Sequence, residues 1–249
     1  MHVSPIGCEV LTIAHISIRN LTVEFKVYGS NARSLKKQLL SQATGGRIAS
    51  NANDAVTVKA LDNVSLEINH GDRIGLTGHN GSGKTTLLRT LAGIYKPTGG
   101  TIAIEGSVGA LLDPASGMDA EATGVENIYL RGFILGMTRS EIDSKVDEIA
   151  RFTELGKFLE LPVKTYSAGM FSRLGFAIST AIQPDILLVD EGIGAGDASF
   201  RENVIARTQE FVSKANIAIF ASHDHAFLQD MGASLISLEH GNIVEDLRT

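Results

Sequence analysis

One glycine-rich octapeptide constrains this chain more than any other feature. It reads Gly78-His79-Asn80-Gly81-Ser82-Gly83-Lys84-Thr85 and is followed by Thr86. The spacing is that of a phosphate-binding loop: a glycine, four residues, then Gly-Lys and a hydroxyl residue. A strand-like apolar run at 73–77 leads into it and a helix-like run at 85–92 leads out. This is the strand–loop–helix setting that such a loop requires.

The residue types in this loop match the chemistry of phosphate binding. Glycines let successive backbone N–H groups turn toward phosphate oxygens, which a Cβ atom would obstruct. The helix that follows adds the positive end of its dipole. We expect Lys84 to reach the β- and γ-phosphates and the Thr85 hydroxyl to ligate Mg²⁺. The loop alone indicates only a nucleotide phosphate, because kinases, GTPases and transport ATPases all use it.

Composition limits the class of protein. The 249 residues are 43% hydrophobic and 20% charged, which allows one large soluble domain with a full core. A formal net charge of −6 gives no reason to expect nucleic-acid binding. Cys8 is the only cysteine, which excludes an internal disulfide and suits a reducing compartment. No apolar run approaches the ~20 residues that span a bilayer, and no signal-peptide pattern opens the chain. We therefore expect a cytosolic protein that another subunit must hold at any membrane it serves.

The chain around the loop has the pattern of strands. Strands are expected at 16–25 and 56–68, separated by an insertion at 29–53. The insertion has a basic, amphipathic part at 33–40 and a Gly/Ala/Ser/Asn-rich remainder; it is a tolerated surface insertion or, alternatively, a docking element. After the loop, strand-like runs at 101–104 and 107–112 flank a Glu105-Gly106 turn, which predicts a hairpin.

The pattern becomes helical from about residue 113 to 182. Thr123…Glu126 and Thr138…Glu141 are capping boxes, each of which predicts a helix start. Ser167 is expected to cap a third helix that runs to about Ile182.

Strands return after the helices. Apolar runs at 186–189 and 217–220 predict central strands of a parallel sheet covered on both faces, and 235–245 predicts a closing hairpin. We predict one α/β domain over 1–249, a P-loop NTPase with a mainly parallel central sheet and an N-terminal antiparallel β subdomain. The nucleotide-binding core would comprise 1–112 and 183–249, and the inserted helical subdomain 113–182.

Two carboxylates close the apolar run at 186–189. Such a strand would deliver Asp190 to the sheet edge beside the phosphates, where it can hold Mg²⁺, usually through water. Glu191 would then face the attacking water and orient or deprotonate it. The alternative is a buried strand ending in a solvated acidic turn, which the phosphate-binding loop upstream disfavours.

Two further stretches extend the site. His223 follows the strand at 217–220 and can contact the γ-phosphate, although a lone histidine there is more often structural. Ser167-Ala168-Gly169 at a helix start forms a second anion site. Two phosphate-binding elements for one nucleotide indicate that one of them serves a partner's nucleotide.

The ordered set of these motifs, with the turn Gly196-Asp197, resembles the nucleotide-binding subunits of ABC transporters over residues 16–245. The resemblance implies a homodimer that sandwiches two ATP molecules, with Ser167, Ala168 and Gly169 of one copy closing on the phosphate held by Lys84 of the other. It also implies that Phe25, or less favourably Tyr28, stacks on adenine, and that Asp197 contacts the dimer partner.

Two departures from the family pattern narrow the resemblance. The usual Leu-Ser-Gly-Gly-Gln signature is here Tyr-Ser-Ala-Gly-Met, 166–170. The glutamine expected near Leu111-Leu112-Asp113 is missing, and Asp113 is a candidate metal ligand in its place. Both departures, together with the stretches Gly117-Met118-Asp119 and 123–128, resemble the branch that exports O-antigen, capsule or teichoic-acid precursors. Some members of it carry a further C-terminal carbohydrate-binding domain, which we do not expect here.

The resemblance predicts the ATP-hydrolysing subunit of an exporter of lipid-linked polysaccharide. It would be peripheral, on the cytoplasmic side of the inner membrane, with a separate integral-membrane permease and no nucleic acid as partner. ATP and Mg²⁺ are the expected cofactors, and Lys84, Glu191 and His223 the expected catalytic residues. The alternatives are an ABC ATPase for another cargo and a soluble ABC-type ATPase acting on DNA or ribosomes.

Overall fold

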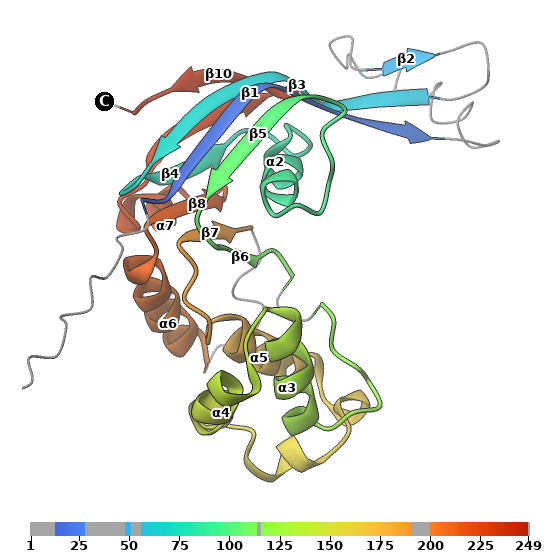
Figure 1. Cartoon of the computed structure of the whole chain (residues 1–249), viewed down its shortest axis with the longest axis vertical. Coiled ribbons are helices and arrows are strands. Elements are labelled where there is room, and N and C mark those ends of the chain that lie inside the picture. The colour runs from blue at the N-terminus through green and yellow to red at the C-terminus, as the bar shows by residue number, and fades with distance from the viewer. Residues whose placement is uncertain (1–12, 28–47, 51–55, 114–115, 191–199, 249) are drawn as a thin grey trace, which may run out of the picture.

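The chain folds into two lobes (Figure 1). The computed structural model describes residues 13–27, 48–50, 56–113, 116–190 and 200–248. One lobe, the sheet lobe, contains all the strands of the described residues, and the other, the helical lobe, contains the chain from α3 (Gly124–Ile134) to α5 (Ala168–Ser179) (Figure 1). None of the helices in these described residues is long and apolar enough to cross a membrane.

A six-stranded sheet forms the centre of the sheet lobe, in the order β10-β9-β4-β8-β7-β6. All neighbouring pairs are parallel except β9 and β10, which form the predicted C-terminal hairpin. The strands are β4 (Arg73–Thr77), β6 (Val108–Leu111), β7 (Ile186–Val189), β8 (Ile217–Ala221), β9 (Ser234–Glu239) and β10 (Asn242–Asp246).

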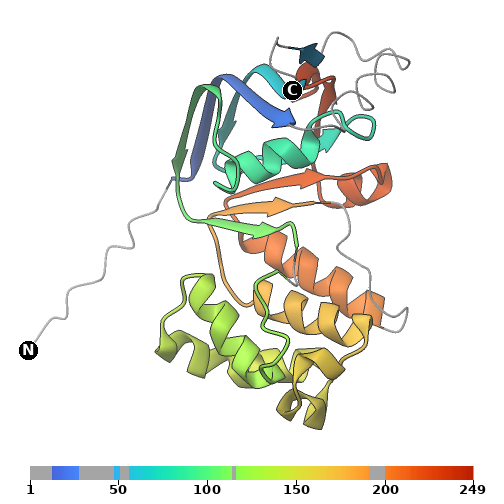
Figure 2. The same cartoon turned by 90° about the vertical axis from the view of Figure 1, so that its right-hand side faces the viewer.

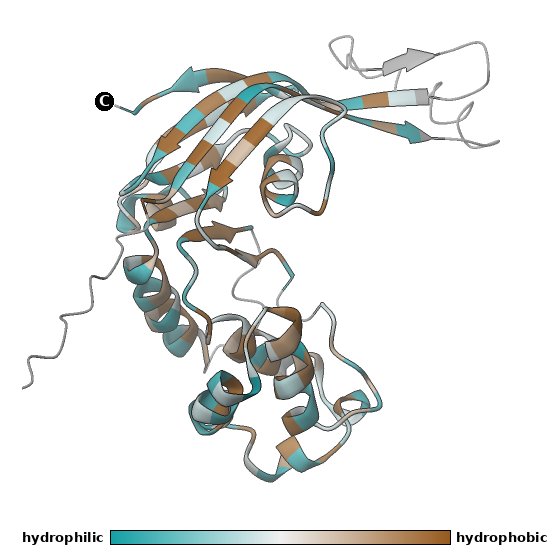
Figure 3. Cartoon of the chain, viewed as in Figure 1, coloured by the Kyte–Doolittle hydropathy of each residue, from teal (hydrophilic) through white to brown (hydrophobic). Residues whose placement is uncertain are grey.

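The central strands β7 and β8 are buried on both faces, which explains their uninterrupted apolar sequences (Figure 3). In β7, Ile186 and Leu188 pack into the core between the two sheets, whereas Leu187 and Val189 pack into the core on the opposite face. The second core is closed by α6 (Arg201–Lys214) and α7 (His225–Asp230). The sequence-based prediction of a covered parallel sheet is confirmed.

A second, antiparallel sheet packs over the first. Its order is β2-β3-β1-β5, with β1 (His15–Val27), β2 (Ile48–Ser50), β3 (Val56–Asn69) and β5 (Gly99–Glu105). Helix α2 (Lys84–Leu91) lies between the two sheets, and its buried leucines join their common core (Figure 2). The helix that begins at Lys84 is therefore packed against a sheet on each side.

The predicted hairpin around Glu105-Gly106 is wrong. Strand β5 pairs with β1 in the antiparallel sheet, whereas β6 pairs with β7 in the parallel sheet. The chain changes sheets at Ser107, whose N–H and hydroxyl both donate to the carboxylate of Asp185, just before β7. These bonds draw the start of β6 away from β5.

The helical lobe has a small core of its own. It contains α3 (Gly124–Ile134), α4 (Arg139–Thr153), α5 (Ala168–Ser179) and the short helices η1 (Gly156–Glu160) and η2 (Val163–Thr165). Both predicted capping boxes form, with the hydroxyls of Thr123 and Thr138 accepting the N–H of Glu126 and Glu141. Each carboxylate in turn accepts the N–H of its threonine, so both helices begin where the sequence predicts.

Candidate functional site

Several of the predicted site residues lie where the parallel strands end. Strand β4 leads into the phosphate-binding loop at Gly78, β7 into Asp190, and β8 into Ser222 and His223. Because these strands run parallel, their carboxyl ends lie at the same edge of the sheet. Ligands of open α/β sheets bind at that edge.

The loop at 78–83 wraps around the amine of Lys84. Lys84 is 7% exposed, and its Nζ donates to the carbonyl oxygens of Gly78 (2.6 Å) and His79 (3.3 Å). Helix α2 begins at Lys84, immediately after Gly83, so its first N–H groups face the same space. The loop, the lysine and the helix start together form an anion-binding cradle.

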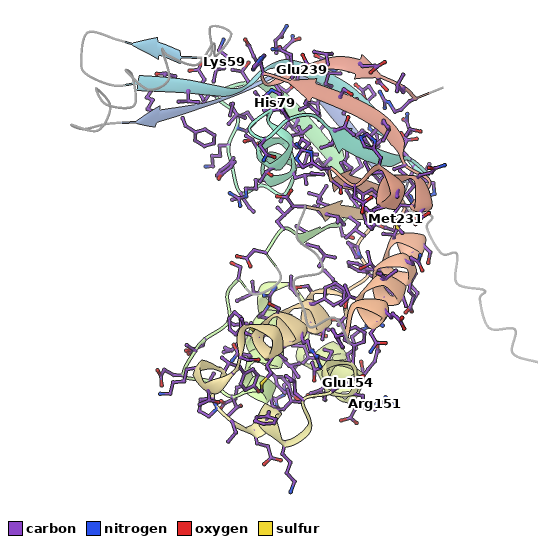
Figure 4. The ribbon with its side chains drawn as sticks, turned by 180° about the vertical axis from the view of Figure 1, so that it is seen from behind. Lys59, His79, Arg151, Glu154, Met231 and Glu239 are labelled. Carbon is purple, nitrogen blue, oxygen red and sulfur yellow. The ribbon has the colours of Figure 1, made fainter. Side chains whose placement is uncertain are left out.

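The C-terminal hairpin supports the loop from behind. At Gly78, φ is +131°, and an added Cβ would lie 2.1 Å from the carbonyl oxygen of Leu238 in β9. The Gly241 N–H, in the β9–β10 turn, donates to the carbonyl of Ser82 (2.8 Å). The rings of His79 and His240 pack with centroids 5.0 Å apart. Figure 4 shows His79 and Glu239, from the loop and the hairpin, on the same part of the sheet lobe.

The cradle opens into a pocket of about 390 Å³. Its wall is formed by β3, the loop, the start of α2 and the end of β7, through Ala60, Asn80, Gly81, Ser82, Gly83, Lys84, Thr85, Thr86 and Asp190. The Thr85 hydroxyl donates to Asp190 Oδ1 at 3.2 Å. Two oxygen ligands in adjacent positions around Mg²⁺, at ~2.1 Å each, would lie about 3 Å apart. The hydroxyl and the carboxylate are therefore close enough to share one Mg²⁺, whether Asp190 ligates it directly or through water.

His223 follows β8, the strand that lies between β4 and β7 in the parallel sheet. Its Nε2 is 2.9 Å from the side-chain oxygen of Asn80 and 3.5 Å from Lys84 Nζ. The structure thus brings the predicted histidine within reach of the phosphate cradle. The contact with Asn80 depends on the path of the loop in space, so it could not be found from spacing.

The part of the pocket wall that β3 contributes is formed by a β-bulge. Val23 of β1 lies opposite Leu61, and the next residue, Glu24, lies opposite Lys59, so Ala60 is an extra residue in β3. Ala60 lines the pocket. Phe25 lies opposite Val58, two residues before Ala60 and therefore about 7 Å further along the strand. Phe25 is thus beside the pocket, beyond its phosphate-binding part.

The residues of the second predicted anion site lie in the helical lobe. Ser167 caps α5, and its hydroxyl accepts the N–H of Met170 at 3.2 Å. Ser167 and Ala168 are exposed and Gly169 is partly exposed. None of the three is among the described residues that line the pocket around Lys84. The preceding Tyr166 anchors the turn, because its hydroxyl donates to the carbonyl of Phe158 at 2.7 Å.

Asp113 stands beyond the end of β6, near Arg131 of α3. Burial lowers the pKa of Arg131, which is 5% exposed, and the nearby carboxylate of Asp113 raises it. Arg131 also donates to the hydroxyl of Ser179 at 3.0 Å, so it links α3 with α5. Asp113 is not among the described residues around the pocket, and its role as a metal ligand stays a prediction. Three predicted site residues, Glu191, Asp197 and Tyr28, lie outside the described residues.

Comparisons with known proteins give a family and several relatives. Residues 61–194 match the family described as ABC transporter. The chain is 46% identical to the O-antigen export system ATP-binding protein RfbE of Yersinia enterocolitica over 92% of this chain and 95% of that protein. It is 41% identical to the O-antigen export system ATP-binding protein RfbB of Myxococcus xanthus over 77% of this chain and 43% of that protein. It is 36% identical to the teichoic acids export ATP-binding protein TagH of a Bacillus cereus strain over 92% of this chain and 40% of that protein.

A solved structure shows the same fold. It is a dimeric ATP-binding cassette in a post-hydrolysis state bound to ADP and Pi, 20% identical, with a TM-score of 0.67. The match covers 94% of this chain and 99% of the other. The predicted fold class, with its mainly parallel sheet, antiparallel sheet and inserted helices, is confirmed.

Proposed function

This chain belongs to the ATP-binding family of ABC transporters, which bind and hydrolyse ATP, and we propose that it powers export of a lipid-linked polysaccharide through a separate membrane permease. The observation that carries the cargo class is the 46% identity to a protein named for O-antigen export, over nearly the full length of both chains. Its likeness to a protein named for teichoic acid export points to the same chemical class, a glycan polymer.

The phosphate end of ATP would lie in the pocket at the sheet edge. Lys84, the loop N–H groups and the start of α2 bind and orient the β- and γ-phosphates. Thr85 and Asp190 would hold Mg²⁺, which supplies charge neutralisation between the phosphates. Glu191 orients the attacking water, and the His223 ring, which contacts Asn80 through Nε2, would donate to the γ-phosphate in place of Asn80 when nucleotide binds. Phe25, beside the pocket, stacks on adenine.

Two copies would complete each site. The described walls of the pocket supply donors from the P-loop side, whereas the Ser167 helix start lies in the other lobe. A head-to-tail homodimer brings Ser167, Ala168 and Gly169 of one protomer, with Asp197 nearby, against the phosphate held by Lys84 of its partner. ATP then bridges the two protomers, and its hydrolysis releases them.

The helical lobe would receive the permease. Helix α3 exposes Leu130, Phe133 and Ile134, which are 41%, 50% and 68% exposed. Apolar side chains exposed on one helix are suited to packing against a partner. The protein would then work as a peripheral subunit on the cytoplasmic face of the inner membrane.

The sandwich can be tested with Glu191→Gln, which removes the base and keeps the shape. With saturating ATP, this variant should become a dimer by size-exclusion chromatography with light scattering, with turnover abolished. The matched control is Glu191→Gln with Lys84→Ala, which should stay monomeric because the phosphate cradle is lost. A Glu191→Gln protein that stays monomeric in ATP would show that the sandwich assignment is wrong.

The cargo class can be tested in cells that lack this subunit. Wild-type protein should restore polymer at the cell surface, and Lys84→Ala should leave lipid-linked glycan inside. Normal surface glycan without the subunit would favour the alternative, an ABC ATPase for another cargo.

A further inference from the structure

Phe25, the residue proposed to stack on adenine, is held by a contact from outside the phosphate-binding loop. Phe25 of β1 packs against Tyr95, with ring centroids 5.1 Å apart and planes at 76°. This is an edge-to-face pair, a preferred geometry for aromatic rings. Tyr95 lies in the segment between α2 and β5 and is partly buried, as Phe25 is.

Tyr95 is held in turn by the phosphate-binding helix. Arg89, in the last turn of α2, donates from Nη1 to the Tyr95 hydroxyl at 3.0 Å. Its guanidinium carbon lies 5.9 Å from the centre of the Tyr95 ring, and the Tyr95 N–H donates to the Arg89 carbonyl at 3.2 Å. The tyrosine is thereby fixed at its backbone, its ring and its hydroxyl by one residue.

The other end of this segment is tied to the strand that carries Phe25. The N–H and hydroxyl of Thr98 donate to the carbonyl of Thr22, at 2.8 and 3.0 Å. Thr22 and Phe25 both belong to β1. The segment from α2 to β5 therefore spans from the phosphate helix to the aromatic strand, with Tyr95 at its centre.

We propose that Tyr95 is a positioning residue for the base of the nucleotide, because it holds the Phe25 ring in the orientation that stacks on adenine. Arg89, on the same helix as Lys84, in turn fixes the position of the Tyr95 ring. The inference rests on the proposed stacking role of Phe25. Arg89 is five residues after Lys84 on a rigid helix, about 7.5 Å along its axis. The contacts from Arg89 to Tyr95 and from Tyr95 to Phe25 therefore fix the ring that stacks on adenine relative to the loop and Lys84 that bind the phosphates.

This arrangement makes a specific prediction about affinity. Tyr95→Leu removes the ring that supports Phe25 and keeps apolar volume, so ADP should bind about threefold to tenfold more weakly, as for the loss of one aromatic pair. Tyr95→Phe keeps the ring contact and loses only the hydroxyl bond to Arg89, so its loss should be smaller. Ile94→Ala, at an adjacent side chain that is 60% exposed, is the matched control and should bind ADP normally.

The experiment compares ADP with inorganic pyrophosphate, in Mg²⁺, by isothermal titration calorimetry and competition. Neither ligand is hydrolysed, so only binding is measured. If Tyr95 positions the base, Tyr95→Leu should weaken the binding of ADP and leave the affinity for pyrophosphate unchanged. Equal weakening of both ligands would mean that Tyr95 merely stabilises α2, and would overturn the inference. Thermal unfolding of each variant confirms that it is folded at the assay temperature.

Phe25→Ala separates failure of this inference from failure of the proposed function. If Tyr95 acts through Phe25, then Phe25→Ala should weaken ADP binding. The double variant Phe25→Ala with Tyr95→Leu should then bind ADP no more weakly than Phe25→Ala alone. If Phe25→Ala weakens ADP and Tyr95→Leu does not, the role of Tyr95 is refuted and the stacking role of Phe25 stands. If Phe25→Ala leaves ADP affinity unchanged, the stacking assignment itself is wrong.

Discussion

Gly78 and Gly81 offer a matched test of how the phosphate-binding loop is held. Both have positive φ, +131° and +78°, so alanine is strained at either position. They differ in their surroundings: a Cβ at Gly78 would lie 2.1 Å from the Leu238 carbonyl oxygen, whereas a Cβ at Gly81 has nothing within 4 Å. The pair therefore compares a position with backbone strain alone with a position that has both strain and a close contact with β9.

The expected costs follow from these two environments. Gly81→Ala should lose about 1–2 kcal/mol, the cost of left-handed backbone for an L-residue. Gly78→Ala carries at least this strain, because its φ lies further from the left-handed region, and it must also push the loop or the hairpin aside, which costs about 1–3 kcal/mol more. For a chain of this size each kcal/mol lowers the melting temperature by about 2–4 °C.

Calorimetry and urea unfolding of the nucleotide-free variants give the difference directly. Gly78→Ala should be less stable than Gly81→Ala by at least about 1 kcal/mol. Equal stability of the two variants would refute the reasoning, because it would show that the loop does not rest on the carbonyl of Leu238.

Three further predictions concern the rest of the site and the helical lobe. Ser167→Asp should preserve the melting temperature, because aspartate caps helices as well as serine does, yet abolish ATPase activity through repulsion of the partner's γ-phosphate; retained activity would place Ser167 away from phosphate. Thr85→Val removes the hydroxyl that donates to Asp190, so ATP affinity should fall in Mg²⁺ and remain unchanged in EDTA; an equal loss in both would exclude a metal role. Hydrogen bonds from Thr123 and Thr138 lower the pKa of Glu126 and Glu141, so these carboxylates stabilise the fold above their unfolded pKa and this stability is lost as the pH falls below about 4.5. The double variant with glutamine at both positions should therefore show a flatter pH dependence of unfolding between about pH 5 and 3, and an unchanged profile would contradict the capping role.

Local patterns in the sequence predicted the parts of the fold that depend on local chemistry. The loop at 78–85, both capping boxes and the buried strands β7 and β8 each follow from spacing and residue type alone. The path of the chain at Ser107 could not be predicted in this way, because it depends on Asp185, far away in sequence. Helix α6 was not anticipated, although Val204, Phe211 and Val212 are spaced to share its buried side.

In the candidate site, too, the residues within local motifs could be predicted and the contacts between distant segments could not. Motif spacing identified Lys84, Thr85, Asp190 and His223, which the fold brings to one sheet edge. The neighbours that shape the pocket depend on strand register and packing across the sheets. Ala60 enters the wall only because β3 has an extra residue there, and Tyr95 meets Phe25 only because the segment after α2 returns to β1.

The contact between the β9–β10 turn and the phosphate-binding loop also has a consequence for biosynthesis. The Gly241 N–H bonds to the carbonyl of Ser82, and the Gly241 carbonyl accepts the N–H of Asp62. More than 150 residues therefore separate the loop from the turn that secures it. We therefore expect a ribosome-bound chain to complete this loop only after β9 and β10 have emerged, and chains truncated before these strands to bind ATP more weakly than the full chain.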